Sequence, residues 1–179
     1  MRSHATAALI PVLLALAGSE PAAALVQPER MEPIKPQSGD GGRVCGVAGD
    51  FNVSGEMLRV EVGTIRSDAG ASVVLIRAYV PNAVGPVMRD LWLKTPTIFS
   101  LGRFKPAREN GNGILEVRGP VDAGDAAAVL AEIAAGDVEV SIVFDGPMPA
   151  ARFPVGLPRP LPIDLAGALD DCAGGAVPR

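Results

Sequence analysis

The chain contains two cysteines, Cys45 and Cys172, whose chemistry depends on whether they are reduced or joined. Cysteines that carry out redox catalysis usually stand two residues apart, whereas these are separated by 172 − 45 = 127 positions. In an exported protein, two cysteines most simply form one structural disulfide. We therefore predict a Cys45–Cys172 disulfide that joins the two ends of the folded domain.

Histidine chemistry is absent from the expected mature chain. The only histidine, His4, lies in a segment that we expect to be removed, so neither a Ser-His-Asp nor a Cys-His arrangement can form. A zinc site usually needs histidine or several thiolates, and one oxidised cysteine pair supplies neither. The sequence shows no phosphate-loop or nucleophile-elbow motif. It therefore predicts no catalytic residue, no metal and no cofactor.

Carboxylates are the remaining side chains that could supply acid and base chemistry, as in glycoside hydrolysis. Four of them lie near the ends of expected strands or in loops: Asp50, Asp90, Glu109 and Asp145. Nothing in their spacing brings any two together. The alternative to a non-enzymatic protein is a carboxylate-dependent hydrolase or lyase acting on cell-wall or carbohydrate material. It requires two carboxylates in one cleft, about 5–9 Å apart.

One concentration of basic residues interrupts a chain whose formal net charge is −4. It lies among aromatic side chains and consists of Arg89, Lys94, Arg103, Lys105 and Arg108. Such a patch could bind an anionic envelope component or an acidic face of an envelope protein. The other interpretation is a solvated strand edge whose charges prevent aggregation. The acidic total argues against a nucleic-acid partner.

The first 24 residues have the features of a secretory signal peptide. A short basic start precedes an apolar run over residues 8–18, which is too short to cross a bilayer. Ala22-Ala23-Ala24 offers the small residues that a signal peptidase accepts, and Ala17-Gly18-Ser19 is a second candidate site. We expect cleavage after Ala24, a periplasmic or secreted location, and no transmembrane span in the mature chain.

The mature chain is expected to have three parts. Residues 25–42 are rich in proline and glycine and predict a flexible linker. Residues 43–173 are expected to form one globular domain, because the mature length of 179 − 24 = 155 residues suffices for a hydrophobic core. Residues 174–179 are expected to be a disordered tail.

Strands are indicated by apolar residues at a period of two. Residues 58–63 alternate in this way, and the continuous aliphatic run 73–76 is typical of a strand covered on both faces, so the two predict a hairpin. Further strand patterns occur at 91–93, 98–101, 114–117 and 137–144, with a second hairpin expected between 97–104 and 114–118. The proline-rich stretch 146–162 is expected to be irregular.

Two short helices are indicated in the second half of the chain. Asp122 can cap the first, an apolar stripe follows at positions 126, 129, 130 and 133, and Gly136 fits a C-terminal stop. The second opens at Asp164 and carries Cys172 on its apolar face. These elements predict an α+β domain with a mostly antiparallel sheet of five or six strands, two short helices and one disulfide.

The last third of the chain also carries a family resemblance. A helix ending in Ala134-Ala135-Gly136 leads into the strand 137–144, and a proline-rich stretch then precedes Leu161-Pro162-Ile163-Asp164-Leu165-Ala166-Gly167-Ala168-Leu169. This order resembles the closing segment of small exported bacterial proteins of the invasion-associated locus B type. The resemblance implies a periplasmic or envelope-associated protein without known catalytic residues, and it assigns no site residue here.

These observations together predict an exported bacterial envelope protein that binds a partner and catalyses no reaction. A sheet face or the basic patch would provide the contact surface. A third hypothesis is a carrier of a small apolar ligand held between sheet and helix, which requires a cavity of about 300 Å³ or more.

Overall fold

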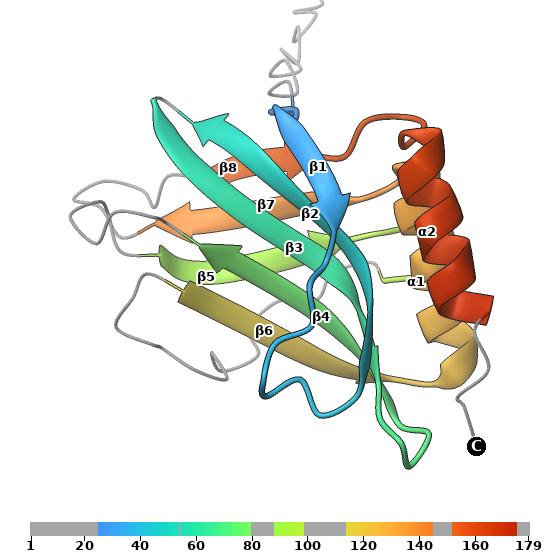
Figure 1. Ribbon diagram of the computed structural model, residues 1–179. Coiled ribbons are helices and arrows are strands. Elements are labelled where there is room, and N and C mark those ends of the chain that lie inside the picture. Colours follow the sequence, from blue (N-terminus) through green and yellow to red (C-terminus); the bar gives the residue numbers. More distant parts are fainter. Residues whose placement is uncertain (1–24, 54, 80–87, 99–113, 145–151, 175–179) are drawn as a thin grey trace, which may run out of the picture.

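The computed structural model describes residues 25–53, 55–79, 88–98, 114–144 and 152–174 (Figure 1). These ranges contain eight strands and two helices, so the α+β class is confirmed with more strands than the five or six expected. In chain order the elements are β1 (Arg30–Pro33), β2 (Arg43–Val53), β3 (Glu56–Arg66), β4 (Ser72–Tyr79), β5 (Met88–Lys94), β6 (Ile114–Val121), α1 (Ala123–Ala135), β7 (Glu139–Phe144), β8 (Arg152–Gly156) and α2 (Ile163–Gly174).

The strands form two antiparallel sheets, one ordered β1-β2-β3-β4-β6 and the other β5-β7-β8. The predicted β3–β4 hairpin is present. β6 pairs with β4, whereas residues 99–104, its expected hairpin partner, lie outside the described residues. The expectation of an irregular stretch over 146–162 is wrong for β8, which pairs with β7 although it contains Pro154. A strand at a sheet edge tolerates proline because only one of its sides needs a full hydrogen-bond ladder.

One hydrophobic core joins the inner faces of both sheets to the two helices, which lie together on one side of the molecule (Figure 1). Its members include Val62 and Ile76 from the larger sheet, Leu93 and Ile142 from the smaller one, and Ile133 from α1. Burial of such side chains is the main favourable contribution to folding. In the described part of the chain, no helix combines the length and apolar character needed to cross a membrane.

Both helices follow the predicted pattern. The Asp122 carboxylate accepts a hydrogen bond of 2.8 Å from the Asp125 N–H, which caps α1. Gly136 ends it in the left-handed conformation, at φ 75°, where glycine carries no steric penalty. The apolar stripe of α1 is buried as expected. In α2, Leu165 and Leu169 are buried, and the helix begins at Ile163, one residue before the predicted start.

The segment 25–42, which we expected to be a flexible linker, is part of the folded domain. Val26 forms a parallel bridge with Val155 of β8, and β1 pairs with β2 at the edge of the larger sheet. The following segment, residues 34–42, which we call the strap, crosses the outer face of that sheet. Its Ile34 and Asp40 side chains are both buried. Contacts with distant strands hold the strap in place, and local composition could not reveal them.

Candidate binding site beside the disulfide

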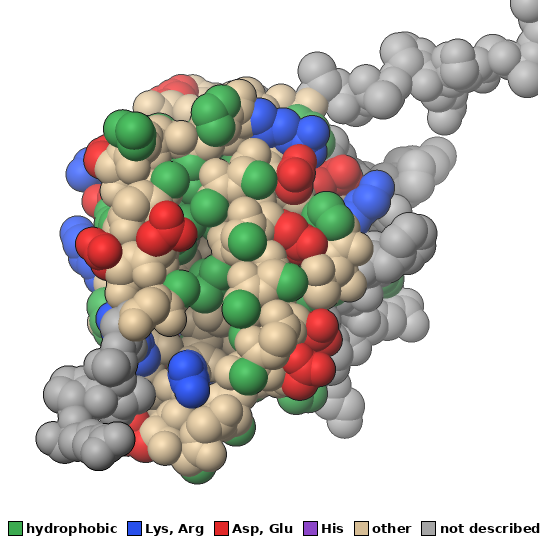
Figure 2. All heavy atoms as spheres, turned by 90° about the vertical axis from the view of Figure 1, so that its right-hand side faces the viewer, with side chains coloured by type: hydrophobic (Ala, Val, Ile, Leu, Met, Phe, Trp, Pro, Cys, Tyr) green, Lys and Arg blue, Asp and Glu red, His purple; other side chains and the backbone are tan. Residues whose placement is uncertain are grey.

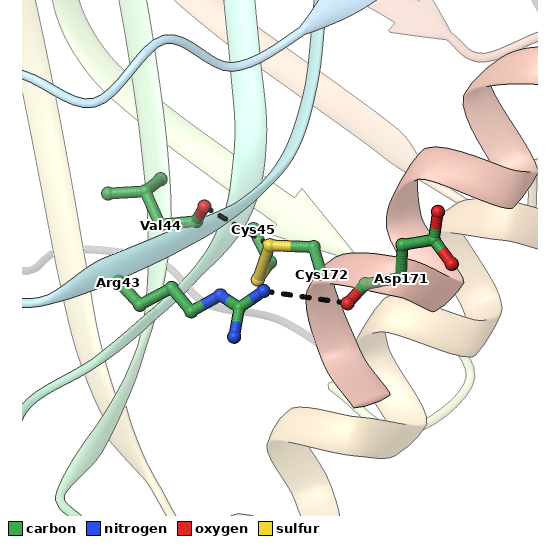
Figure 3. Close-up of a disulfide and its surroundings, with 5 residues drawn as sticks. All are labelled: Arg43, Val44, Cys45, Asp171 and Cys172. Carbon is green, nitrogen blue, oxygen red and sulfur yellow. Dashed lines mark hydrogen bonds between the residues drawn. A yellow bond between two sulfur atoms is a disulfide. The ribbon is translucent and has the colours of Figure 1, made fainter. Parts of the chain in front are cut away.

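The structure joins Cys45 of β2 to Cys172 of α2, as predicted, with their Cα atoms 5.7 Å apart. Figure 3 shows the two neighbouring contacts of this bond. Arg43 donates from Nη2 to the Asp171 carbonyl oxygen at 3.5 Å. The Cys172 Sγ lies 3.4 Å from the Val44 carbonyl oxygen, a contact without a hydrogen because a disulfide sulfur carries none. The disulfide and Arg43 therefore hold the last turn of α2 against β2.

A pocket of about 270 Å³ lies beside the disulfide, where the larger sheet meets the first turns of α1 and the end of α2. The helices contribute short or apolar side chains to it: Ala123, Ala126, Ala127, Leu130, Cys172 and Ala173. Alanine side chains are too short to fill the space between helix and sheet, so this corner remains open. Figure 2 looks onto the helix side of the molecule and shows hydrophobic side chains gathered across it, with carboxylates around them.

The sheet contributes a polar wall to the same pocket. Arg43 and Arg66 stand directly opposite each other on β2 and β3, and both are exposed. Like charges in this position normally destabilise a sheet. The hydroxyls of Thr64, Ser67 and Ser72 also line the pocket. Among the described lining residues Asp68 is the one carboxylate, so their formal charge is 2 − 1 = +1, on a chain whose net charge is −4.

A second polar constellation, the Arg77 cluster (Asp40, Glu61, Arg77 and Glu116), lies on the outer face of the larger sheet. Arg77 is 1% exposed, and its guanidinium contacts all three carboxylates. Glu61 and Glu116 flank it on the neighbouring strands, at the same level of the sheet. Asp40 comes from the strap. Because a buried charge must be paired, the cluster fastens the strap to the sheet.

Two further arginines surround the cluster. Arg59 bonds Glu32 at 2.6 Å, Asp50 at 3.1 Å and Glu61 at 3.5 Å. Arg118 bonds Glu116 at 2.6 Å and also reaches the strap. The carboxylates that the fold brings together on this face are therefore each engaged by an arginine.

The environment shifts the pKa values of two of these carboxylates in opposite directions. Burial raises the pKa of Glu61, and the charge of Arg59 with hydrogen bonds from Arg59 and Tyr79 offsets this only in part. Burial also raises the pKa of Glu116, but hydrogen bonds from Arg77 and Arg118 outweigh it and leave the pKa below its ordinary value. The ionised form is therefore disfavoured at Glu61 and favoured at Glu116.

We expect the variants Glu61→Gln and Glu116→Gln to change the pH dependence of stability with opposite signs. Because the pKa of Glu61 is raised on folding, this residue stabilises the folded state below about pH 4.3. That stabilisation is lost as the pH rises through the pKa of Glu61 in the folded state. Stability of Glu61→Gln relative to wild type should therefore increase with pH. The lowered pKa of Glu116 stabilises the folded state at neutral pH, and this stabilisation is lost as the pH falls. Stability of Glu116→Gln relative to wild type should therefore decrease with pH. Urea denaturation from pH 3 to 8 measures both slopes, and slopes of equal sign would contradict the assignment.

The structure places the residues singled out from the sequence as follows. Asp50 is ion-paired with Arg59 at 3.1 Å. Lys94 is exposed at the end of β5, opposite Glu139, and Arg89 and Asp90 lie in the same strand. The remaining predicted residues lie outside the described ranges: Arg103, Lys105, Arg108, Glu109 and Asp145. The basic patch therefore stays a prediction.

The pocket residues were not identified from the sequence. Alternation along residues 58–63 does indicate which side chains share a face of β3, and Thr64 and Arg66 continue that pattern. The pairing of Arg43 with Arg66 requires the β2–β3 register, which no local signal specifies. Comparison with protein-family models, with curated proteins and with solved structures finds no match to this chain.

Proposed function

We propose that this chain is an exported binding module that catalyses no reaction, and that its ligand site is the pocket beside the disulfide. The pocket carries the proposal. Its volume of about 270 Å³ lies below the range of pockets that hold drug-sized molecules, which begins at about 300 Å³, so the pocket fits a smaller ligand. An apolar wall from the helices faces a few convergent polar groups from the sheet, which is the usual composition of such sites.

Two observations support export. Disulfides form and persist mainly in oxidising compartments, and Cys45–Cys172 joins the first long strand to the last helix. The N-terminal residues have the pattern of a cleavable signal, with Ala22-Ala23-Ala24 as the expected cleavage site. The resemblance to exported proteins of the invasion-associated locus B type favours the same location. The proposed location is the periplasm or the exterior. An envelope protein or an anionic envelope component is the partner proposed for a sheet face or the predicted basic patch, separate from the small ligand of the pocket.

The hydrolase or lyase alternative needs a carboxyl group that can hold a proton next to a substrate. Among the described residues, the carboxylates of Asp40, Glu61 and Glu116 converge on Arg77, which is 1% exposed, so this cluster is closed to a substrate. The strap and the neighbouring Arg118 also lie against it. The geometry therefore favours a structural role for this group, and the binding proposal does not depend on it.

Filling the pocket should abolish ligand binding. We expect Ala127→Trp to remove binding of hexan-1-ol, used here as an apolar probe, because the indole would occupy the space that the small side chains of α1 leave open. Ala127 is exposed, so the change should leave the fold intact. The measurement is a two-dimensional NMR titration that follows the amides of Ala123, Ala126 and Leu130.

The matched control for this variant is Ala131→Trp. Ala131 is also an exposed alanine of α1, one turn further along the helix, and it does not line the pocket. The control should bind the probe as wild type does. If wild type shows no saturable shifts at the pocket amides, or if both variants lose binding equally, the pocket is not the ligand site.

A further inference from the structure

We infer that the ligand of this pocket is a small amphipathic acid, whose carboxylate binds at Arg66 and Arg43 and whose apolar body lies along α1. The inference rests on the proposed function and adds the chemical class of the ligand. It depends on three features of the pocket, which are its paired arginines, its hydroxyl groups and its size.

The arginines indicate an anion. Arg66 of β3 stands directly opposite Arg43 of β2, so the two side chains place positive charge at the same end of the pocket. Within the described part of the chain, Arg66 makes no side-chain ion pair, and its exposed guanidinium borders the pocket. A guanidinium offers N–H donors in a planar fork that matches the two oxygens of a carboxylate.

The hydroxyls extend this polar end. Thr64 and Ser72 are buried, and they line the pocket beside the two arginines. The Ser67 hydroxyl oxygen accepts a hydrogen bond of 3.1 Å from the Ala71 N–H, which leaves its own hydrogen able to donate. Asp68, the only carboxylate among the lining residues that the structure describes, reduces their formal charge to +1, which suits a single negative group better than two.

The helix side of the pocket limits the polarity and the size of the rest of the ligand. Ala123, Ala126, Ala127 and Leu130 present only apolar side chains, and the disulfide closes the wall. A volume of about 270 Å³ corresponds to about nine water molecules at about 30 Å³ each, and an acid of about nine non-hydrogen atoms fills the same space. The start of α1 and the end of α2 both border the pocket, so their opposed end charges largely cancel. Selectivity for an anion therefore comes from the arginine side chains.

The test compares three probes of similar size, hexanoate, hexan-1-ol and hexan-1-amine, in NMR titrations of the oxidised chain. Hexanoate should bind about tenfold more tightly than hexan-1-ol, because a hydrogen bond to a charged group contributes more than one to a neutral group. Hexan-1-amine should bind most weakly. Arg66→Gln should remove the preference, so that hexanoate binds this variant no more tightly than hexan-1-ol does. The control variant is Arg30→Gln. Arg30 is an exposed arginine of β1 that stands opposite Asp50 of β2, so this variant should bind the probes as wild type does.

The possible results separate the inference from the function on which it rests. If hexan-1-ol and hexanoate bind the pocket equally well, the ligand class is wrong while the binding site stands. An unchanged preference for hexanoate in Arg66→Gln would also overturn the inference. If none of the three probes shifts the pocket amides, the proposed function fails as well. Arg66 is exposed, so the variant should remain folded, and its circular dichroism spectrum checks this.

Discussion

Replacing both cysteines by alanine is expected to lower the free energy of unfolding by about 5 kcal/mol. The disulfide closes a loop of 127 residues, and opening it restores conformational freedom mainly to the unfolded chain. At about 2–4 °C per kcal/mol for a chain of this length, the melting temperature should fall by about 10–20 °C. Urea denaturation of oxidised wild type and of the Cys45→Ala, Cys172→Ala double variant measures the difference.

The control is wild type unfolded in the presence of a reductant, which should resemble the double variant. A difference of less than about 1 kcal/mol between oxidised wild type and the double variant would show that the bond contributes little to stability.

The proposed location is tested by a separate measurement. Protein recovered from the envelope of its host should react with a maleimide only after reduction. Cysteines that label without reduction would contradict export to an oxidising compartment.

The variant Arg77→Met is expected to lower the free energy of unfolding by about 3–5 kcal/mol at neutral pH. The methionine side chain keeps most of the packing that the aliphatic part of Arg77 provides, but the buried carboxylates of Asp40 and Glu61 lose a positive partner. An uncompensated buried charge is costly because little water can reach it. The loss should shrink below about pH 4, where protonation removes the negative charges. Urea denaturation at pH 7 and at about pH 3 measures both effects.

Arg30→Met serves as the matched control, because Arg30 is exposed and pairs only with Glu32, at 3.2 Å, among its described contacts. Surface ion pairs contribute about 0–1 kcal/mol, so this change should be nearly silent. Equal losses in Arg77→Met at both pH values would indicate a packing defect in place of a charge effect. Hydrogen exchange in the strap provides a second readout, because Asp40 would no longer be held at Arg77.

Much of the fold could be predicted because its signals are local. The alternation over 58–63 and over 137–144 identified β3 and β7, since a strand with one buried face repeats every two residues. The N-cap Asp122 and the stop at Gly136 bounded α1 for equally local reasons. The disulfide could be predicted because only one pairing of two cysteines exists.

The errors fall where local composition and distant contacts disagree. Proline and glycine in residues 25–42 indicated a linker, yet Ile34 packs on the outer face of the larger sheet, in a cluster with Val44 and Ala48. Pro154 argued against a strand, yet β8 needs a full ladder only toward β7. Favourable tertiary contacts outweighed the intrinsic preference of both segments.

The candidate sites were beyond local reasoning. The residues of the Arg77 cluster are 16, 37 and 39 positions from Arg77 in the sequence. The pocket similarly combines β2, β3, α1 and α2, and it exists because alanines of α1 lie opposite the row that contains Arg43 and Arg66. A one-residue change of register would turn those arginines to the other face of the sheet.

The amino-acid sequence alone therefore determined the fold class, most strands, both helices and the partner of each cysteine, because these depend on residues near in sequence or on a unique pairing. The tertiary structure alone decided that the strap is fastened by Arg77 and that a pocket with two facing arginines remains beside the disulfide. Both features require a specific strand register and the docking of helices on a sheet, and these follow from the packing of the whole chain.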